Sequence, residues 1–274
     1  MPEPMKRAGQ RGEGLIAADE PPPYEIVNAQ ARTSVVFVCD HASRAIPRAL
    51  GNLGLSQEAL SAHIAWDIGA AEVTRRLSRR FDAVAALAGY SRLVIDLNRA
   101  LDDPTSIAVI SDGTLVPGNR ALDHDAARLR ADAIFHPYHR AVGGALEALR
   151  RQGHVPALVS IHTFTPVFRD AHRPWDVGVL WDKDGRMAVP FMDKLRTEHG
   201  LDVGDNLPYS GRDHYAFTVD HHAAASGLPH LSMEIRNDLV ASEAGAEKFA
   251  RLIGDVIEEI VSDPTLFREE IFPE

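Results

Sequence analysis

Two arginines bracket a short stretch of this 274-residue chain, Tyr90–Arg99, which reads YSRLVIDLNR. A guanidinium stays charged at all ordinary pH values and presents a rigid fork of donors, so Arg92 and Arg99 can act as fixed sites for anionic oxygens. The apolar, β-branched run Leu93–Leu97 between them predicts a buried strand. Either arginine alone fits a structural salt bridge, but two of them around one strand indicate a ligand that carries a carboxylate.

Two histidines follow predicted buried strands directly. The apolar run at residues 34–39 leads to His41, and the apolar run at residues 157–161 ends in His162. Polar groups at strand ends lie where α/β folds place their sites. A catalytic zinc takes three protein ligands from His and Asp or Glu, and leaves its fourth position to water. His41, Asp67 and His162 can supply that set.

A carboxyl group inside another apolar strand would complete such a site. Glu234 lies in the predicted strand at residues 230–236, where apolar surroundings restrain the carboxyl group and raise its pKa. An unligated glutamate in this position can accept a proton from the attacking water. Arg92 can then stabilise the oxyanion that forms.

Other polar residues offer alternatives to this arrangement. Three serines are candidate nucleophiles, namely Ser160, Ser210 and Ser232. None of them lies in a Gly-x-Ser-x-Gly turn, so a serine triad is disfavoured. Two further histidine pairs are possible ligands, namely His136/His139 and His221/His222. Their placement in a helix and a loop favours substrate contacts or surface positions, and we expect His139 and Tyr209 to contact the substrate. The single cysteine, Cys39, is expected to be a small buried apolar residue.

The elements that would position these residues alternate between strand and helix. Strands are expected near residues 34–39, 82–88, 93–97, 157–161, 177–181 and 230–236, and helices near 69–80, 123–151, 189–198 and 241–262. Two strands that almost adjoin in sequence, 82–88 and 93–97, predict an antiparallel pair and therefore a mixed sheet. The alternation predicts an α/β protein with a three-layer α/β/α architecture. Residues 102–123, punctuated by Pro and Gly, are expected to form a binding loop.

Composition limits the partners and the number of domains. The net charge is −10 and the basic residues are dispersed, so a nucleic acid is not an expected partner. No apolar span is long enough to cross a membrane, and a lone cysteine forms no intrachain disulfide, so we expect a cytoplasmic protein. Residues 1–23 are rich in Gly, Pro and charge and predict a flexible arm, followed by a single domain over residues 24–274.

Assembled in order, these residues resemble the N-formylglutamate amidohydrolase (N-formylglutamate deformylase) family. The matching segments are Asp40–Ser43, Trp66–Asp67, Ser91–Arg99, His136–His139, Ser160–Thr163 and Met233–Arg236. The most specific of them, Ser91–Arg99, is also similar to a stretch of the zinc aspartoacylases and, more distantly, of the carboxypeptidase A superfamily.

The resemblance implies a zinc-dependent amidohydrolase with a zinc-carboxypeptidase-like (phosphorylase/hydrolase-like) fold and one Zn²⁺ per chain. Its expected substrate is N-formyl-L-glutamate or a related small N-acyl amino acid. By the same resemblance, Arg92 would polarise the scissile carbonyl, Asn98 with Arg99 would hold the substrate carboxylate, and Glu234 would be the general base.

One position departs from the wider superfamily. Aspartoacylases and carboxypeptidases place a glutamate ligand three residues after the first histidine, where this chain has Arg44. We therefore expect Asp67 to be the second ligand, with His63 as the alternative. Two other functions remain open, namely a zinc carboxypeptidase acting on small peptides and a non-catalytic small-molecule-binding protein that has lost the metal.

Overall fold

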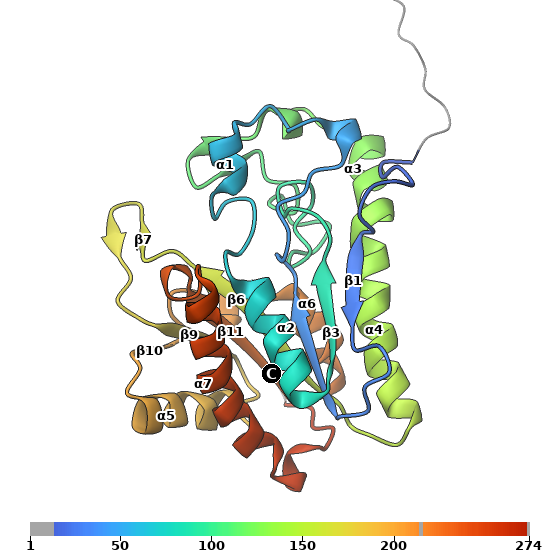
Figure 1. The fold of residues 1–274 in the computed structure, drawn as a ribbon. Helices are drawn as coiled ribbons and strands as arrows, with labels where there is room; N and C mark the ends of the chain where they lie inside the picture. The colour runs from blue at the N-terminus through green and yellow to red at the C-terminus, as the bar shows by residue number, and fades with distance from the viewer. Residues whose placement is uncertain (1–13, 214–215, 273–274) are drawn as a thin grey trace, which may run out of the picture.

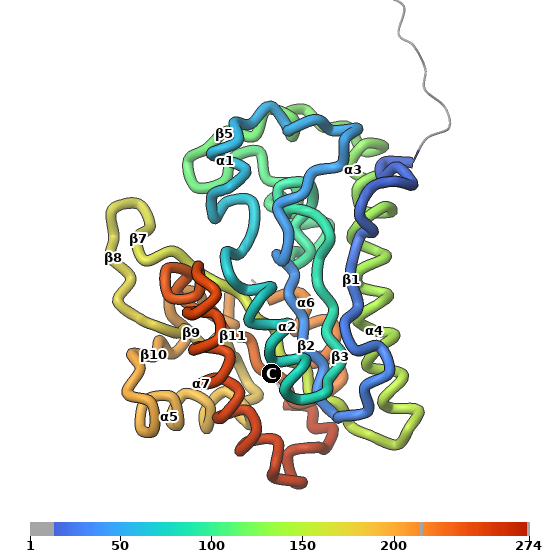
Figure 2. Tube along the Cα trace, in the orientation of Figure 1, coloured from blue at the N-terminus to red at the C-terminus, as the bar shows by residue number. Residues whose placement is uncertain are grey.

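A single mixed sheet forms the centre of the molecule. Over residues 14–213 and 216–272, which the computed structural model describes, it contains seven strands (Figures 1 and 2). In sheet order they are β1 (Tyr24–Val27), β3 (Val84–Ala88), β2 (Val35–Cys39), β6 (Ala157–Phe164), β11 (His230–Arg236), β9 (Val177–Leu180) and β10 (Val203–Asp205). The four strands from β3 to β11 are parallel, and β1 and β9 run antiparallel to their neighbours β3 and β11.

Helices cover both faces of the sheet. On one face lie α2 (Ala70–Phe81), α5 (Ala188–His199) and α7 (Glu243–Val261), and on the other lie α4 (His136–Arg151) and α6 (Phe217–His222). Strands β2 and β3 are buried at every position because helices pack on both of their faces. The expected three-layer α/β/α architecture is confirmed. None of the described helices has the length and apolar character needed to cross a membrane.

The strand expected at Leu93–Leu97 is wrong. Residues 91–100 form turns and irregular backbone, so the expected antiparallel pair between 82–88 and 93–97 does not exist. The sheet is mixed for another reason, because β1 pairs antiparallel with β3 and β9 pairs antiparallel with β11.

Side chains from other segments replace the hydrogen bonds of a strand ladder at this stretch. Asn119 Nδ2 donates to the Leu93 carbonyl, Arg130 Nη1 donates to the Val94 carbonyl, and His139 Nε2 donates to the Leu97 carbonyl, each at 2.9 Å. The apolar side chains between 93 and 97 are buried, as the sequence pattern predicted. Burial requires that backbone polar groups be paired, but it does not require that a neighbouring strand pair them.

The helical pattern at residues 123–151 forms two joined helices. A five-residue π-helical segment, Ala131–Phe135, links α3 (His124–Arg130) to α4. Pro137 lies in the first turn of α4, where the missing N–H is tolerated.

Short elements cover the carboxyl ends of the parallel strands. They are α1 (Gln57–Ser61), the hairpin of β4 (Ile110–Ser111) with β5 (Thr114–Leu115), and the hairpin of β7 (Val167–Phe168) with β8 (Ala171–His172). Figure 1 shows α1 above the ends of β2 and β3, and the β7 hairpin projecting beside the ends of β6 and β9. The loop expected at residues 102–123 contains the β4–β5 hairpin.

Part of the predicted arm lies against the domain. Leu15 is buried, Glu20 accepts a hydrogen bond from the Arg48 N–H, and Tyr90 Oη donates to the Pro21 carbonyl. The flexible arm predicted for residues 1–23 is therefore wrong for residues 14–23, while residues 1–13 lie outside the described part of the chain.

Candidate metal centre

Neighbouring strands bring the candidate site residues to one edge of the sheet. His41 follows the end of β2, His162 lies within β6, and β2 and β6 are paired in parallel. Glu234 lies in β11 directly opposite His162. Asp67 comes from the segment before α2, and its backbone N–H donates to the His41 carbonyl at 3.0 Å.

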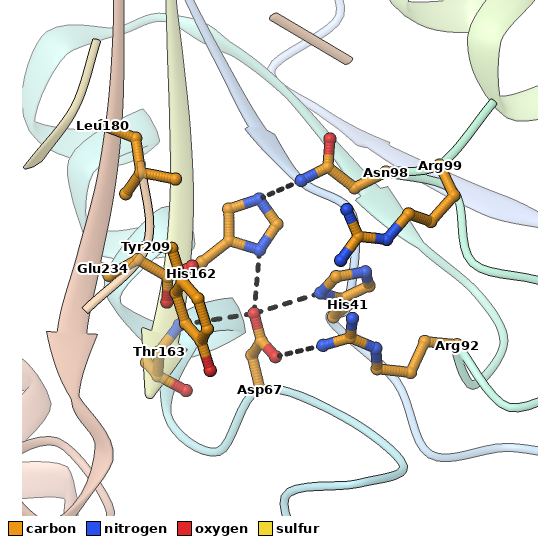
Figure 3. Close-up of a pocket in the computed structure, with 10 residues that line it drawn as sticks. All are labelled: His41, Asp67, Arg92, Asn98, Arg99, His162, Thr163, Leu180, Tyr209 and Glu234. Carbon is orange, nitrogen blue, oxygen red and sulfur yellow. Dashed lines mark hydrogen bonds and ion pairs between the residues drawn. The ribbon is translucent and has the colours of Figure 1, made fainter. Parts of the chain in front are cut away.

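His41, Asp67 and His162 form a buried cluster whose ligand atoms all lie within 4.8 Å of one another. Asp67 Oδ2 is 3.2 Å from His41 Nδ1 and 2.9 Å from His162 Nδ1, and Figure 3 shows the three side chains converging. In a tetrahedral site with ligand bonds of about 2.0–2.1 Å, neighbouring donors lie about 3.3 Å apart. The donor types and their spacing therefore fit a divalent metal ion.

The geometry separates the two alternatives for the second metal ligand, Asp67 and His63. His63 lies outside the cluster, with its Nε2 3.1 Å from Asp112 Oδ2 and its side chain 35% exposed. Arg44 donates to Ser61 Oγ at 2.7 Å. The fold places Asp67, and not His63, beside both histidines. Asp67 therefore provides a carboxylate in the cluster, which the residue at position 44, an arginine, cannot do.

A further carboxylate lies behind each histidine. His41 Nε2 donates to Asp96 Oδ1 at 2.7 Å, and His162 Nε2 is 3.3 Å from Asp40 Oδ2. Tyr138 Oη donates to the other Asp40 oxygen at 2.6 Å. Carboxylates in this position orient metal-binding imidazoles and select their tautomer. The sequence did not assign these roles to Asp40 and Asp96, since they depend on contacts between distant segments.

The charges in the cluster stabilise one another. Burial and the nearby Arg92 both favour a neutral His41, but the carboxylates of Asp96 and Asp67 outweigh them and raise the His41 pKa. Burial opposes ionisation of Asp67, but His41 and His162 hold the Asp67 pKa well below its ordinary value. Against the effect of burial, hydrogen bonds to Asp40 and Asp67 likewise raise the His162 pKa well above its ordinary value. A metal ion that binds beside the Asp67 carboxylate would therefore displace protons from the imidazoles.

Glu234 has the surroundings expected of a general base. Burial, reinforced by Asp67, raises its pKa to about 7, although His162, His41 and Arg92 act in the opposite direction. Its Oε2 atom is buried and makes no hydrogen bond to any described residue. A buried acceptor without a partner is costly, which is consistent with a group kept for a ligand or water. The pKa increase expected from the sequence is confirmed.

A small cavity of about 110 Å³ joins these groups. Its lining comprises His41, Asp67, Arg92, Asn98, Arg99, His162, Thr163, Leu180, Tyr209 and Glu234 (Figure 3). Arg92 is held from one side, because its Nε and Nη2 donate to Asp96 Oδ2 at 3.0 and 2.7 Å. Its Nη1 is 3.7 Å from Asp67 Oδ1, so the guanidinium borders the metal cluster.

Asn98 and Arg99 reach the same cavity from the irregular stretch that replaces the expected strand. The Thr218 N–H, in the first turn of α6, donates to Asn98 Oδ1 at 3.0 Å. Asn98 Nδ2 consequently faces the cavity, 3.4 Å from His162 Nε2. The structure thus brings both predicted carboxylate-binding residues beside the predicted ligands.

Tyr209 reaches the cavity from the loop that follows β10. This loop packs tightly on β9, since a Cβ added to Gly178 would lie 2.2 Å from the Leu207 carbonyl oxygen. Gly178 is the β9 residue opposite Glu234, so the close approach brings Tyr209 to the same end of the sheet. Arg173 Nη1 donates to Tyr209 Oη at 3.3 Å.

His139 lies apart from the cavity lining. Its Nε2 donates to the Leu97 carbonyl, and its Nδ1 is 3.0 Å from His222 Nε2. Burial lowers the His139 pKa to about 4. Both ring nitrogens of His139 are engaged within the protein, and its bond to the Leu97 carbonyl holds the backbone next to Asn98.

Comparisons with known proteins agree with this site. The family model for N-formylglutamate amidohydrolase matches residues 33–241, a range that includes every residue of the cavity lining. The crystal structure of the gene product Atu2144 from Agrobacterium tumefaciens is 35% identical, with a TM-score of 0.88 over 90% of this chain and 98% of that one. N-formylglutamate amidohydrolase from Ralstonia eutropha JMP134 shares the fold at 18% identity, with a TM-score of 0.62 over 88% of this chain and 97% of that one. No protein with a curated description matches the sequence.

Proposed function

The chain belongs to the N-formylglutamate amidohydrolase family, and we propose that it hydrolyses the amide bond of N-formyl-L-glutamate, or of a closely related N-acyl amino acid. The products would be formate, or another carboxylic acid, and the free amino acid. The observation that carries this proposal is Glu234, a buried carboxyl group without a hydrogen-bond partner in the described chain, opposite His162 of the candidate metal cluster.

His41, Asp67 and His162 would hold a single Zn²⁺ ion. Zinc in a site of this type acts as a Lewis acid and lowers the pKa of bound water to about 7. Asp40 and Asp96 would keep the two imidazoles in the tautomer that leaves each Nδ1 free to bind.

The surrounding residues would carry the proton and stabilise the charges of the reaction. Glu234 takes the proton of the attacking water and passes it to the leaving amine. Arg92, fixed by its two hydrogen bonds to Asp96, donates to the oxyanion that develops on the formyl carbonyl. Asn98 and Arg99 bind the α-carboxylate and so hold the amide bond in place.

Two features favour this function over the alternatives. A cavity of about 110 Å³ suits a single amino-acid derivative better than an extended peptide. The idea of a binding protein without metal rested on Arg44, but Asp67 provides a carboxylate in the cluster.

Release of the free amino acid from a panel of N-acyl amino acids tests the proposal. We expect turnover of N-formyl-L-glutamate that is lost with a chelator and regained with zinc, and little release of C-terminal residues from unblocked dipeptides. A zinc-loaded protein that releases the free amino acid from none of the N-acyl amino acids would overturn the proposed function.

Glu234→Gln tests the proposed base. Loss of proton transfer should lower kcat by about 10²–10⁴-fold, since general bases contribute roughly that much. Zinc content, measured by metal analysis, should stay at one ion per chain because Glu234 is not a ligand. Glu58→Gln, which changes an exposed glutamate of α1, is the matched control. Unchanged turnover in Glu234→Gln would remove Glu234 from the mechanism.

A further inference from the structure

A third arginine, Arg173, contacts Tyr209 of the cavity lining. Arg173 follows the β7–β8 hairpin, and its backbone N–H donates to the Pro166 carbonyl at 2.8 Å, close to the end of β6. Its residue exposure is only 8%. The hairpin thus holds a buried guanidinium beside the strand that carries His162.

The surroundings of Arg173 are aromatic. Its guanidinium lies 4.6 Å from the centre of the Phe168 ring, 5.0 Å from that of Tyr209 and 5.9 Å from that of Phe164. Its one side-chain hydrogen bond within the described chain is the 3.3 Å bond to Tyr209 Oη, and no carboxylate of that part of the chain lies within 4.0 Å. Cation–π contacts orient the guanidinium but leave most of its donors unused.

Arg130 shows how this chain satisfies a buried guanidinium that serves only structure. Arg130 is 2% exposed and also lacks an acidic partner, but it donates to the carbonyls of Val94 and Gly118 and to Asn119 Oδ1. Among the described residues, the Arg173 side chain has a single hydrogen-bond acceptor, Tyr209 Oη. Its other donors are therefore available to an anion.

Tyr209 connects this guanidinium to the cavity. Arginine can only donate, so Tyr209 Oη must accept the hydrogen bond from Arg173, and its own hydrogen is available for another acceptor. Burial, reinforced by Glu234, raises the Tyr209 pKa, which keeps the hydroxyl protonated. Tyr209 lines the cavity together with Arg92 and Glu234. Arg173 and Tyr209 therefore form a pair of donors on the side of the cavity supplied by β9 and the hairpin.

We propose that Arg173 and Tyr209 bind the side-chain carboxylate of a dicarboxylic substrate, while Asn98 and Arg99 hold its α-carboxylate. This inference rests on the proposed function and assigns the part of the site that selects an acidic side chain. It follows that the enzyme should distinguish glutamate derivatives from glutamine derivatives, which have the same shape but no side-chain charge.

The experiment compares N-formyl-L-glutamate with N-formyl-L-glutamine as substrates of the zinc-loaded protein. The wild type should favour the glutamate derivative in kcat/KM by about 10- to 100-fold, the effect of one charged hydrogen-bonded pair. Arg173→Met should remove that preference by lowering kcat/KM for the glutamate derivative alone. Arg169→Met, which removes an exposed cation from the same hairpin, should leave it intact. Arg173→Lys should keep part of the preference, and it replaces Arg173→Met if that variant does not fold.

Calorimetric titration of the same proteins with L-glutamate and L-glutamine separates the two proposals. If the wild type hydrolyses neither substrate but binds L-glutamate more tightly than L-glutamine, and only when Arg173 is present, the inference stands and the proposed function fails. If it hydrolyses both derivatives equally, or if Arg173→Met and Tyr209→Phe lower both rates by the same factor, the proposed function stands and the inference is overturned. Absence of both hydrolysis and binding overturns both.

Discussion

Asp96 connects three groups on which the proposed chemistry depends. Its Oδ1 accepts from His41 Nε2 and from the Asn98 backbone N–H, at 2.7 and 2.9 Å, and its Oδ2 accepts from Arg92. The guanidinium of Arg92 is the largest influence that lowers the Asp96 pKa against the effect of burial. One buried carboxylate thus positions a metal ligand, the oxyanion donor and the substrate clamp together.

Asp96→Asn should weaken zinc binding and catalysis together. The amide keeps the size of the side chain but removes the charge that fixes His41 and balances Arg92, and losses of about 10- to 100-fold in metal affinity are typical of such partners. Competition with a chromogenic chelator measures the affinity, and formate release measures kcat. Asp102→Asn, which changes an exposed carboxylate close to Asp96 in sequence, is the matched control. Zinc affinity within about threefold of the wild type in Asp96→Asn would contradict the role of this carboxylate.

At the level of single residues, the sequence identified candidate site residues where a polar side chain interrupts or ends a predicted buried strand. His41, His162 and Glu234 could be recognised because each interrupts or ends an apolar run. Asp40 and Asp96 also end or interrupt apolar runs, but the sequence does not show which histidine each of them contacts. Asp96 and His41 are 55 positions apart in sequence, and their hydrogen bond exists only because the chain turns back over the sheet edge.

Among the elements, the stretch at residues 91–100 depends most on its neighbours. Its carbonyls are held by Asn119, Arg130 and His139, which come from a turn and from two helices. The α4 and α6 helices meet here, because His139 also contacts His222. The placement of Asn98 and Arg99 therefore rests on the packing of elements that are distant in sequence.

The contact between His139 and His222 predicts a pH dependence of stability. Burial lowers the His139 pKa from 6.5 to about 4, and its Nδ1 can accept from His222 only while it is unprotonated. Between pH 6.5 and 4 the unfolded chain binds a proton at this position and the folded chain does not, so the fold loses about 2–3 kcal/mol as the pH falls through that window.

Chemical denaturation of wild type and His139→Gln at several pH values measures this contribution. The variant should be less stable at pH 7, because a flexible amide cannot hold both the Leu97 carbonyl and His222 as the imidazole does, and the difference from the wild type should shrink by about 2–3 kcal/mol between pH 6.5 and 4. His136→Gln, on a partly exposed position of α4, should leave the difference from the wild type independent of pH. A constant difference for His139→Gln would refute the argument.

Most of the longer elements could be predicted from periodicity, and the main error was at Leu93–Leu97. The helices at 70–81, 188–199 and 243–261 and the strands β2, β3, β6, β9 and β11 follow the expected ranges closely. The run Leu93–Leu97 has the composition of a strand, but buried donors from other segments satisfy its backbone. The local sequence pattern predicts that a segment is buried. It does not predict which groups will form hydrogen bonds with its backbone.

At the scale of the molecule, the metal cluster joins three segments that are far apart in the chain. The bond between His41 and Asp67 spans 26 positions, and the bond between Asp67 and His162 spans 95. A metal ion bound there would link the neighbouring strands β2 and β6 to the segment before α2, and a link that closes long loops restricts the unfolded chain most.

Zinc should therefore raise the thermal stability of the whole domain. Free zinc at 100 times its dissociation constant contributes about 2.7 kcal/mol, which corresponds to a rise of about 5–10 °C for a domain of this size. Differential scanning fluorimetry with and without chelator measures the effect. His162→Ala should abolish the rise, and His63→Ala, which changes the histidine outside the cluster, should keep it. An equal rise in His162→Ala would place the stabilising ion elsewhere.

The three-layer architecture could be predicted from the order of helices and strands, whereas the order of strands in the sheet could not. Placing β11 between β6 and β9 is what sets Glu234 opposite His162. The sequence indicated that both residues are candidate site residues, but it did not indicate that they lie next to each other. Pairing between strands 66 positions or more apart leaves no local sequence pattern.

The two outer strands have a consequence for solubility. β1 is four residues long and β10 is three, and each carries an exposed acidic side chain, Glu25 and Asp205. Because Glu25 is paired with Arg75, the protection comes from the shortness of these edge strands, which offer few free amides to a second molecule. The long central strands that hold the chemistry are thereby shielded from intermolecular β-pairing, so concentrated solutions of the folded protein should resist fibril-like aggregation.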